Sequence, residues 1–472
     1  MCIERQGDKI MEQKVIEISE NYDAIIIGFG KGGKTLAKEL GDAGQKTVMI
    51  EKSSKMYGGT CPNVGCIPTK SYVYRAGLAA AAGGSFEERA AAYREAVEHK
   101  DELTGRLRAK NHLKLSSHPN ITVMDGTARF VSSHEVEVEH EGTVTRLAGS
   151  RIFINTGASA FIPPIEGIKG NPFVYTSETL LDLKELPKKL VIIGGGYIGV
   201  EFSSIYANFG SEVTILQDED VFLPREDADI ADAVRKSLAL RGVEVLAGVK
   251  VRSVRQAQEN AAVTFEDSEG EKTLNADAVL VATGRRPETG SLNLKAAGIE
   301  VNSRGGIITD DSMMTTAPEV YAMGDVTGGL QFTYISLDDS RIIKSRILGD
   351  GSYTLKKRGA VPYSVFLAPA FSRVGLSEKD AIAAGYQVKT AGLAAADIVK
   401  SKVLEQTDGL LKAVIDEKTG LILGAHLFCE ESYELINIIK MAMDTNAPYT
   451  ILRDMIFTHP TMAEAFNDLF AV

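Results

Sequence analysis

The sequence predicts an α/β protein in which one unit with a parallel sheet is inserted into a second such unit, and an α+β domain follows. Three observations support this prediction: a repeated strand–turn–helix–strand pattern, two further strands that end in glycine turns, and a change of pattern near the C-terminus. A chain of 472 residues is long enough for roughly three domains.

The repeat is the strongest of these signals. Tyr22–Lys52 reads YDAIIIGFGKGGKTLAKELGDAGQKTVMIEK, and Leu190–Asp220 reads LVIIGGGYIGVEFSSIYANFGSEVTILQDED. A single GxGxxG pattern is weak, but two in register, each between two apolar strands, predict two Rossmann-like dinucleotide-binding units. The glycines coincide in pairs 166 residues apart: Gly28 with Gly194, Gly30 with Gly196, Gly33 with Gly199, and Gly44 with Gly210.

Two further strand–turn segments, Arg151–Ala158 (RIFINTGA) and Ala278–Pro287 (AVLVATGRRP), flank the second repeat, and Tyr321–Asp325 (YAMGD) follows them. We therefore expect the second unit to interrupt the first. From about Lys356, strand-like runs followed by the helical stretch Glu434–Thr445 indicate a separate α+β domain. The expected parts are an N-terminal extension (1–20), a first dinucleotide domain (21–158 and 279–350), a second one (159–278) and a C-terminal domain (351–472).

Composition narrows the function. The net charge of −11 argues against a nucleic-acid surface and against a polybasic membrane anchor. No run approaches the 18 apolar residues of a transmembrane helix, and the N-terminus mixes charges of both signs without the apolar core of a secretory signal. We therefore expect a cytoplasmic protein.

A close pair of cysteines, Cys61 and Cys66, stands out among the four, which also include Cys2 and Cys429. In a reducing compartment such a pair is more often catalytic or metal-binding than structural. On an ideal helix the two Cα atoms would lie about 8–9 Å apart, beyond the limit of about 7 Å for a disulfide. Pro62 and Gly65 indicate a distorted helix start that would shorten this distance. Two buried thiols are the alternative, and zinc is disfavoured because no second ligand pair follows at suitable spacing.

Two side chains at strand ends suit ribose binding. Glu51 lies 23 residues beyond Gly28 and ends its strand, where an acid typically binds a dinucleotide ribose. Gln217 occupies the equivalent place in the second unit, followed by the acids Asp218–Asp220. These acids would repel the 2′-phosphate of NADPH, so NADH is the expected reductant, with NADPH as the alternative if Arg225 folds back.

The segment GGTCPNVGCIPTK (Gly58–Lys70), together with GGGYIGVE, ATGRRP, the GD motif and HPTMAE, resembles the pyridine nucleotide–disulfide oxidoreductases over nearly the whole chain. The resemblance implies an FAD domain, an inserted NAD(P)H domain and a C-terminal dimerisation domain in a homodimer. It also implies a redox disulfide in which Cys66 lies against the flavin and Cys61 exchanges with the substrate.

The resemblance assigns further roles. It implies that Lys70 and Glu201 form an ion pair beside the flavin, and that Tyr197 covers the nicotinamide pocket. His459 would act as the acid–base of the other subunit's cysteine pair, with Glu464 orienting its ring. The expected FAD residues are Gly28, Gly30, Gly33, Glu51, Gly59, Thr60, Lys70, Thr156, Gly157, Gly324 and Asp325. The expected NAD(P)H residues are Gly194, Gly196, Tyr197, Gly199, Glu201, Gln217 and Gly284.

Departures from the better-known members point to one group. The chain ends NDLFAV, without the cysteine pair of mercuric reductases, and it reads GDVTGGLQFTYISLDDSRI after the GD motif, unlike dihydrolipoamide dehydrogenases. This last segment resembles the bacterial reactive-chlorine-resistance reductases, a group that includes hypothiocyanous acid reductases. Four other segments carry the same resemblance: IIGFGKGGKTLA, MYGGTC, FLPREDADIAD and PYSVFLAPAFSRVG. The expected substrate is therefore a small oxidant. A dihydrolipoamide dehydrogenase, a Cu(II) or Hg(II) reductase and a non-catalytic redox sensor are the alternatives.

Overall fold

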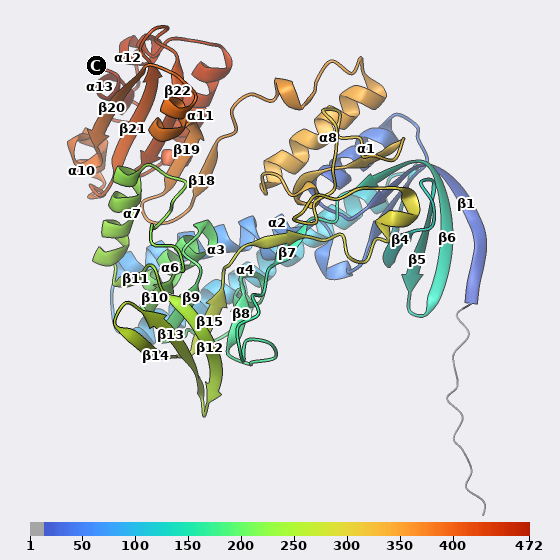
Figure 1. Cartoon of the computed structure of the whole chain (residues 1–472), viewed down its shortest axis with the longest axis horizontal. Coiled ribbons are helices and arrows are strands. Elements are labelled where there is room, and N and C mark those ends of the chain that lie inside the picture. The colour runs from blue at the N-terminus through green and yellow to red at the C-terminus, as the bar shows by residue number, and fades with distance from the viewer. Residues whose placement is uncertain (1–13) are drawn as a thin grey trace, which may run out of the picture. The chain divides into compact units, whose positions relative to one another are not determined.

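The computed structural model describes residues 14–472, which form two compact units (Figure 1). Unit 1 contains the described residues up to 63 together with 103–159 and 285–357, and unit 2 contains 64–102, 160–284 and 358–472. Within the described part of the chain, no helix has both the length and the apolar character needed to cross a bilayer.

Unit 1 is built on a seven-stranded mixed sheet in the order β3-β2-β1-β6-β5-β4, with β17 paired to β6. β1, β2, β3, β6 and β17 pair in parallel, whereas β4 and β5 add antiparallel strands. The strands are β1 (Lys14–Ile27), β2 (Thr47–Glu51), β3 (Ile121–Asp125), β4 (Thr127–Phe130), β5 (Glu135–His140), β6 (Thr143–Ile154) and β17 (Val320–Ala322).

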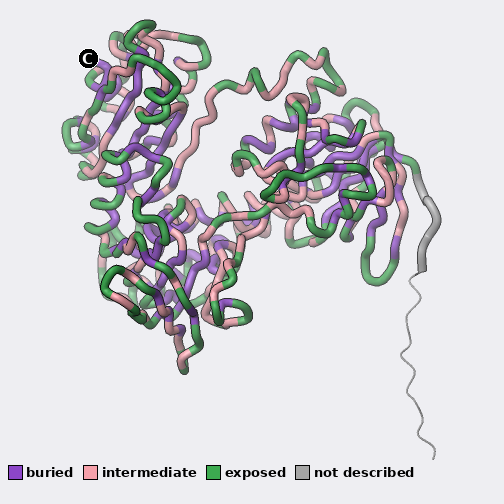
Figure 2. Tube along the Cα trace, in the orientation of Figure 1, coloured by how far each residue is buried: buried purple, intermediate pink, exposed green. Residues whose placement is uncertain are grey.

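Both faces of the parallel strands are buried, as a parallel sheet requires. Along β1, Ala24 and Ile26 belong to the core beneath α1 (Lys31–Asp42) and α8 (Thr333–Leu348), while Ile25 and Ile27 belong to the core on the opposite face. Figure 2 shows the buried residues concentrated along these strands.

Unit 2 repeats the first pattern. Its parallel sheet has the order β11-β10-β9-β15-β8, and β9-α6-β10 matches β1-α1-β2 of unit 1, so the predicted repeat is confirmed. An antiparallel meander follows it. The elements are β8 (Val174–Thr176), β9 (Lys189–Ile193), α6 (Tyr197–Phe209), β10 (Glu212–Leu216), α7 (Ala228–Leu240), β11 (Val243–Leu246), β12 (Lys250–Ala257), β13 (Asn260–Asp267), β14 (Gly270–Ala276) and β15 (Ala278–Val281).

The C-terminal part of unit 2 is the predicted α+β fold, an antiparallel sheet in the order β18-β19-β22-β21-β20 with helices packed on it. Its elements are β18 (Tyr363–Val365), β19 (Phe371–Gly375), α9 (Glu378–Ala383), β20 (Val388–Ala394), α10 (Val399–Val403), β21 (Leu410–Asp416), β22 (Ile422–Phe428), α11 (Ser432–Asp444), α12 (Thr450–Asp454) and α13 (Ala465–Leu469).

Two features differ from the sequence-based expectation. β1 begins at Lys14, so residues 14–20 are part of a strand rather than an extension, while residues 1–13 lie outside the described chain. Residues 64–102, expected with the first dinucleotide domain, cluster with unit 2. The reason is packing: Tyr72 donates a hydrogen bond to the Leu181 carbonyl, and the Tyr93 hydroxyl meets that of Tyr206 on α6.

Candidate active site

The two glycine turns have the same geometry. Gly28 (φ +100°) and Gly194 (φ +111°) adopt a conformation that disfavours side chains. A Cβ atom at Gly33 would lie 2.7 Å from the Gly28 oxygen, and one at Gly199 would lie 2.1 Å from the Gly194 oxygen. Because α1 and α6 can begin only with glycine at these positions, their first amides lie directly at the strand ends, where a pyrophosphate would bind.

Glu51 forms a hydrogen bond with the backbone of the first glycine turn. Its buried carboxylate accepts hydrogen bonds from the Phe29 amide (2.9 Å) and the Ser53 amide (3.2 Å). Burial raises the pKa of Glu51, and the two amides act in the opposite direction. Glu51 thus lies beside the glycine turn, as its position in the sequence predicts, and its contact with a ribose stays a prediction.

Asn155 connects the first glycine turn to two later segments of unit 1, and the sequence analysis did not single it out. Its side chain accepts a hydrogen bond from the Gly33 amide (2.9 Å) and donates to the Met323 carbonyl (2.8 Å) and to Ser336 Oγ (3.1 Å). A polar residue directly after the buried strand RIFI was the available signal.

Other predicted FAD residues of unit 1 directly follow Asn155 and Met323 in the sequence. Thr156 Oγ1 donates to the Glu288 carbonyl (2.8 Å), and Gly157 follows with a positive φ of +75°. Gly324 and Asp325 open a short 3₁₀ helix, and the Gly324 amide donates to Asp339 (2.7 Å).

The cysteine segment begins on the first glycine turn. A Cβ atom at Gly59 would lie 2.7 Å from the Gly30 Cα atom, so this close approach requires glycine. Thr60 begins α2 (Thr60–Val64), and Cys61 on this helix is half-buried. Asn63 secures the helix, because its amide donates to the Gly59 carbonyl (2.8 Å).

The helix is interrupted before the second cysteine. Gly65, with φ −131° and ψ −119°, separates α2 from α3 (Cys66–Ala82), which confirms the distorted helix start. Cys66 is exposed. Cys61 belongs to unit 1 and Cys66 to unit 2, and their pairing stays a prediction.

Lys70 and Glu201 form an ion pair with an Nζ–Oε1 distance of 2.6 Å. The same carboxylate oxygen accepts the Phe366 amide (2.9 Å), and Lys70 lies 4.5 Å from the centre of the Phe366 ring. The structure therefore brings together the two residues that the resemblance pairs.

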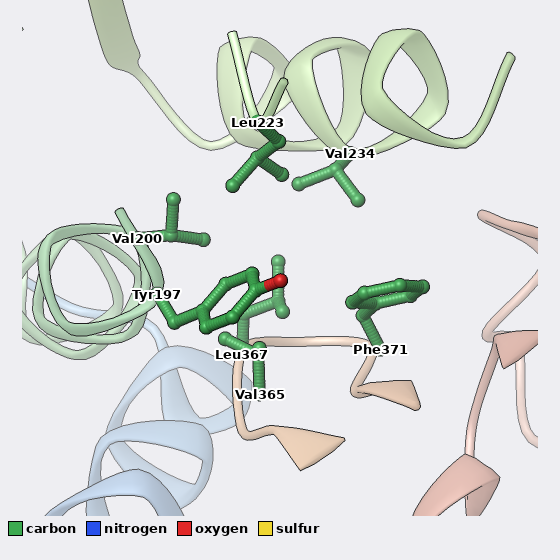
Figure 3. Close-up of a pocket in the computed structure, with 7 residues that line it drawn as sticks. All are labelled: Tyr197, Val200, Leu223, Val234, Val365, Leu367 and Phe371. Atoms are coloured by element: carbon green, nitrogen blue, oxygen red, sulfur yellow. The ribbon is translucent and has the colours of Figure 1, made fainter. Parts of the chain in front are cut away.

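Tyr197, the first residue of α6, lies among apolar side chains, as Figure 3 shows. Its hydroxyl donates to Oε1 of Glu226 (2.5 Å), which also accepts from Tyr363 (2.6 Å). Arg373 donates to the other carboxylate oxygen (3.2 Å), and His426 Nδ1 lies 3.5 Å from it. The residues around Tyr197 are Val200, Leu223, Val234, Val365, Leu367 and Phe371.

The Glu226 carboxylate is charged despite its complete burial. Burial opposes the charge, but the His426 ring, the two phenols and the Arg373 guanidinium outweigh it and lower the pKa of Glu226 to about 2. Sequence reasoning did not single out Glu226 or its partners.

Gln217 follows β10 and is buried. Its amide donates to the Val221 carbonyl (2.7 Å), while its Oε1 is buried without a hydrogen-bond partner among the described residues. A Cβ atom at Gly195 would lie 2.0 Å from this oxygen, so an acceptor lies directly against the second glycine turn. Gly284, after β15, has a φ of +112° and its carbonyl accepts the Phe161 amide.

His459 and Glu464 lie together near the C-terminus. The His459 Nδ1 atom is 2.9 Å from a Glu464 carboxylate oxygen, and 71% of the His459 side chain is exposed. This contact fits the orienting role expected of Glu464, and the acid–base role of His459 stays a prediction. Cys429, after β22, is fully buried, and burial raises the pKa of its thiol.

The sequence model for pyridine nucleotide-disulphide oxidoreductases matches residues 22–340, and the dimerisation domain of the same family matches residues 361–470. The chain belongs to this family. It is therefore a flavoprotein disulfide oxidoreductase, for which the family implies FAD and a pyridine nucleotide as cofactors.

Individual members of the family match nearly the whole chain. The probable pyridine nucleotide-disulfide oxidoreductase RclA of Escherichia coli is 48% identical over 96% of this chain and 99% of its own. A mercuric reductase of Lysinibacillus sphaericus is 33% identical over 97% and 83%, respectively. A solved structure described as the Cu(II) complex of the HOCl-induced flavoprotein disulfide reductase RclA from E. coli matches with a TM-score of 0.90, 48% identity and coverage of 96% and 99%.

The residues present fit both family cofactors. α1 and α6 each start at a glycine without a side-chain cap, which leaves their first turns suited to a pyrophosphate. The buried Gln217 Oε1 suits a ribose hydroxyl, which would supply the missing donor. Among residues 14–472, no three His, Cys, Asp or Glu side chains are grouped to hold a metal ion.

Proposed function

We propose that the chain is an FAD-dependent NAD(P)H reductase that uses a redox disulfide between Cys61 and Cys66 to reduce a small oxidant, foremost hypothiocyanous acid. The observation that carries the proposal is the arrangement of the cysteine segment. Cys61 is half-buried on a short helix that starts against the first glycine turn, and Cys66 begins the next helix after the Gly65 break. The 48% identity to the HOCl-induced reductase favours an oxidant as substrate.

FAD would be held by the first turn, Glu51 and the Asn155–Thr156–Gly157 segment, and Lys70 would face the flavin. NADH would be held by the second turn and Gln217. The acids Asp218–Asp220 favour NADH, with NADPH as the alternative. When bound, FAD supplies the electron transfer from the nicotinamide to the cysteine pair.

The chemistry at sulfur needs only two thiolates. The Cys61 thiolate attacks the sulfur of HO–S–C≡N, forming Cys61–S–S–C≡N and releasing hydroxide, which takes up a proton to become water. The Cys66 thiolate then attacks the Cys61 sulfur, forming the disulfide and expelling thiocyanate. His459, oriented by Glu464, would transfer the protons.

We further propose that the enzyme is a homodimer, because its C-terminal part matches the dimerisation domain of the family. The outward-facing His459 ring, with its Nδ1 held by Glu464, suits a role at the cysteine pair of the other subunit. Gel filtration with light scattering would test this state.

The direct test is NADH oxidation by the purified holoenzyme with hypothiocyanous acid. Turnover should be rapid and lost in Cys61→Ser and in Cys66→Ser, while Cys429→Ala, a change at a buried thiol, should retain it. Rapid turnover of dihydrolipoamide without turnover of hypothiocyanous acid would contradict the proposal and favour a dihydrolipoamide dehydrogenase.

Cu(II) reduction is a second candidate, because the solved relative is described as a Cu(II) complex. In that case anaerobic NADH consumption should depend on Cu(II). A non-catalytic redox sensor would show no sustained NADH consumption with any thiol-reactive oxidant.

A further inference from the structure

Lys34 on α1 lies beside the cysteine segment. Its Nζ atom donates a 2.7 Å hydrogen bond to Oδ1 of Asn111 on α4 (Phe86–Ser116). Asn111 is packed against Gly58, where a Cβ atom would lie 2.6 Å from the Asn111 amide nitrogen and 2.9 Å from Pro62 Cγ. Lys34, Asn111 and the turn that leads into α2 therefore form one packed cluster next to Cys61.

A basic residue also holds the other end of α2. Arg108 of α4 donates a 2.9 Å hydrogen bond to Asn63, whose amide in turn holds the Gly59 carbonyl. Arg108 of α4 thus contacts the Cys61 helix at Asn63, and Lys34 of α1 is joined through Asn111 to the turn that leads into this helix.

The surroundings of Lys34 make its ammonium group easier to deprotonate than that of an exposed lysine. Burial, Lys31 and Lys114 lower the pKa of Lys34 to about 8, whereas Cys61 acts in the opposite direction. Cys61 therefore favours the charged ammonium, and by thermodynamic linkage the ammonium favours the Cys61 thiolate to the same extent. The hydrogen-bond acceptor for Lys34 is a neutral amide, so its charge is not neutralised there.

Lys38, one turn further along α1, differs from Lys34 because its charge is paired with the Asp42 carboxylate at 2.5 Å. The charged and titratable groups of unit 1 around this segment have both signs. Lys31 and Lys114 act on Lys34, and Arg108 contacts Asn63. Tyr57 stacks on His112, donates to Asp125 and is acted on by the Asp125 and Glu51 carboxylates.

We propose that Lys34 is the residue that stabilises the thiolate of Cys61, the sulfur that attacks the oxidant. The assignment of Cys61 as the attacking sulfur rests on the proposed function. With Lys34 charged, a larger fraction of Cys61 is ionised near neutral pH. The attack then needs no prior proton transfer.

The test measures the thiolate directly. In the Cys66→Ser holoenzyme under reducing conditions, the rate of Cys61 alkylation by iodoacetamide is followed from pH 5 to 10 by mass spectrometry of the Cys61 peptide. Adding Lys34→Gln should slow alkylation about tenfold at pH 6.5, whereas Lys34→Arg should keep the parent rate. Lys38→Gln is the matched control on the same helix. The difference between parent and Lys34→Gln should disappear above about pH 9, where Lys34 itself is neutral.

Superimposable pH profiles for the parent and Lys34→Gln, with FAD content unchanged, would overturn the assignment. A uniform slowing at every pH would overturn it as well, because it would indicate altered access rather than charge. Alkylation needs no oxidant, so this result does not depend on whether hypothiocyanous acid is the substrate. If turnover with that acid is rapid and the profiles coincide, only the role of Lys34 fails.

Discussion

The Tyr197 hydroxyl donates a 2.5 Å hydrogen bond to the fully buried carboxylate of Glu226. This contact joins the first residue of α6, directly after the second glycine turn, to a cluster that includes Tyr363 and Arg373 from the C-terminal sheet. The second glycine turn is therefore tied to the C-terminal sheet of unit 2 through a buried carboxylate that sequence patterns did not reveal.

Glu226→Gln should lower the free energy of unfolding by about 3 kcal/mol at pH 7, because it removes the buried carboxylate that pairs with Arg373 and leaves this guanidinium only its 3.4 Å ion pair with Asp380. Since the folded-state pKa of about 2 lies below the ordinary glutamate value, this contribution is complete above about pH 5 and disappears as the pH falls towards 2. Urea unfolding followed by circular dichroism at pH 7 and pH 3 measures the difference. Glu166→Gln, which removes an exposed pair with Arg255, should change stability by less than about 1 kcal/mol. If Glu226→Gln lowered the free energy of unfolding equally at pH 7 and pH 3, the folded protein would not depend on a charged Glu226.

Substitutions in the two glycine turns should affect different cofactors: FAD binding for the first turn and NADH binding for the second. Gly33→Ala places a Cβ atom 2.7 Å from the Gly28 oxygen and should weaken FAD binding about tenfold or more. Gly199→Ala makes a closer contact in the second turn and should raise the KM for NADH with FAD retained. Flavin absorbance and steady-state kinetics distinguish the two outcomes. Gly77→Ala, on α3 with open space around it, is the control and should alter neither. Loss of FAD in the Gly199 variant would argue against separate sites.

Lys70→Met should slow the bleaching of flavin absorbance by NADH about a hundredfold, because a cation that would stabilise negative charge on the reduced ring is removed. Glu201→Gln keeps the lysine but removes its 2.6 Å partner, and should have a smaller effect. Stopped-flow absorbance under anaerobic conditions measures both rates. Unchanged bleaching in Lys70→Met would show that the lysine does not act on the flavin.

His459→Gln should reduce kcat with the oxidant by about a hundredfold, the usual range for loss of a general acid–base. It should leave the rate of flavin reduction by NADH unchanged. Glu464→Gln should cause a milder loss, because the ring keeps its proton-transfer atom and a neutral amide oxygen replaces the carboxylate that contacts Nδ1 at 2.9 Å. The comparison of stopped-flow flavin reduction with steady-state turnover measures this separation, and a loss in both half-reactions would count against the assigned role.

Local patterns predicted much of the fold and part of the site. Both glycine turns, the helix break at Gly65 and the Glu51 strand end each depend on residues within a few positions of one another, so periodicity and spacing sufficed. The Lys70–Glu201 pair spans 131 residues, and only the family resemblance indicated it.

Asn155 and Glu226 were beyond such reasoning. The partners of Asn155 are up to 181 residues away, and Glu226 meets Tyr363 across 137 residues. Each is a polar side chain whose role exists only once distant elements have packed around it. Asn155 at least follows a buried strand directly, but nothing in the sequence beside Glu226 distinguishes it from an ordinary surface glutamate.

If the substrate is an oxidant, as proposed, the other thiols of the protein need protection from it, and the burial of Cys429 provides this protection. Reagents that oxidise thiols react with the ionised form, and the buried setting of Cys429 after β22 keeps its thiol protonated and out of contact with solvent. Among the cysteines of residues 14–472, Cys61 is half-buried and Cys66 is exposed, whereas Cys429 is shielded from solvent. Sulfenylation damage during turnover should accordingly spare Cys429 until the C-terminal domain unfolds.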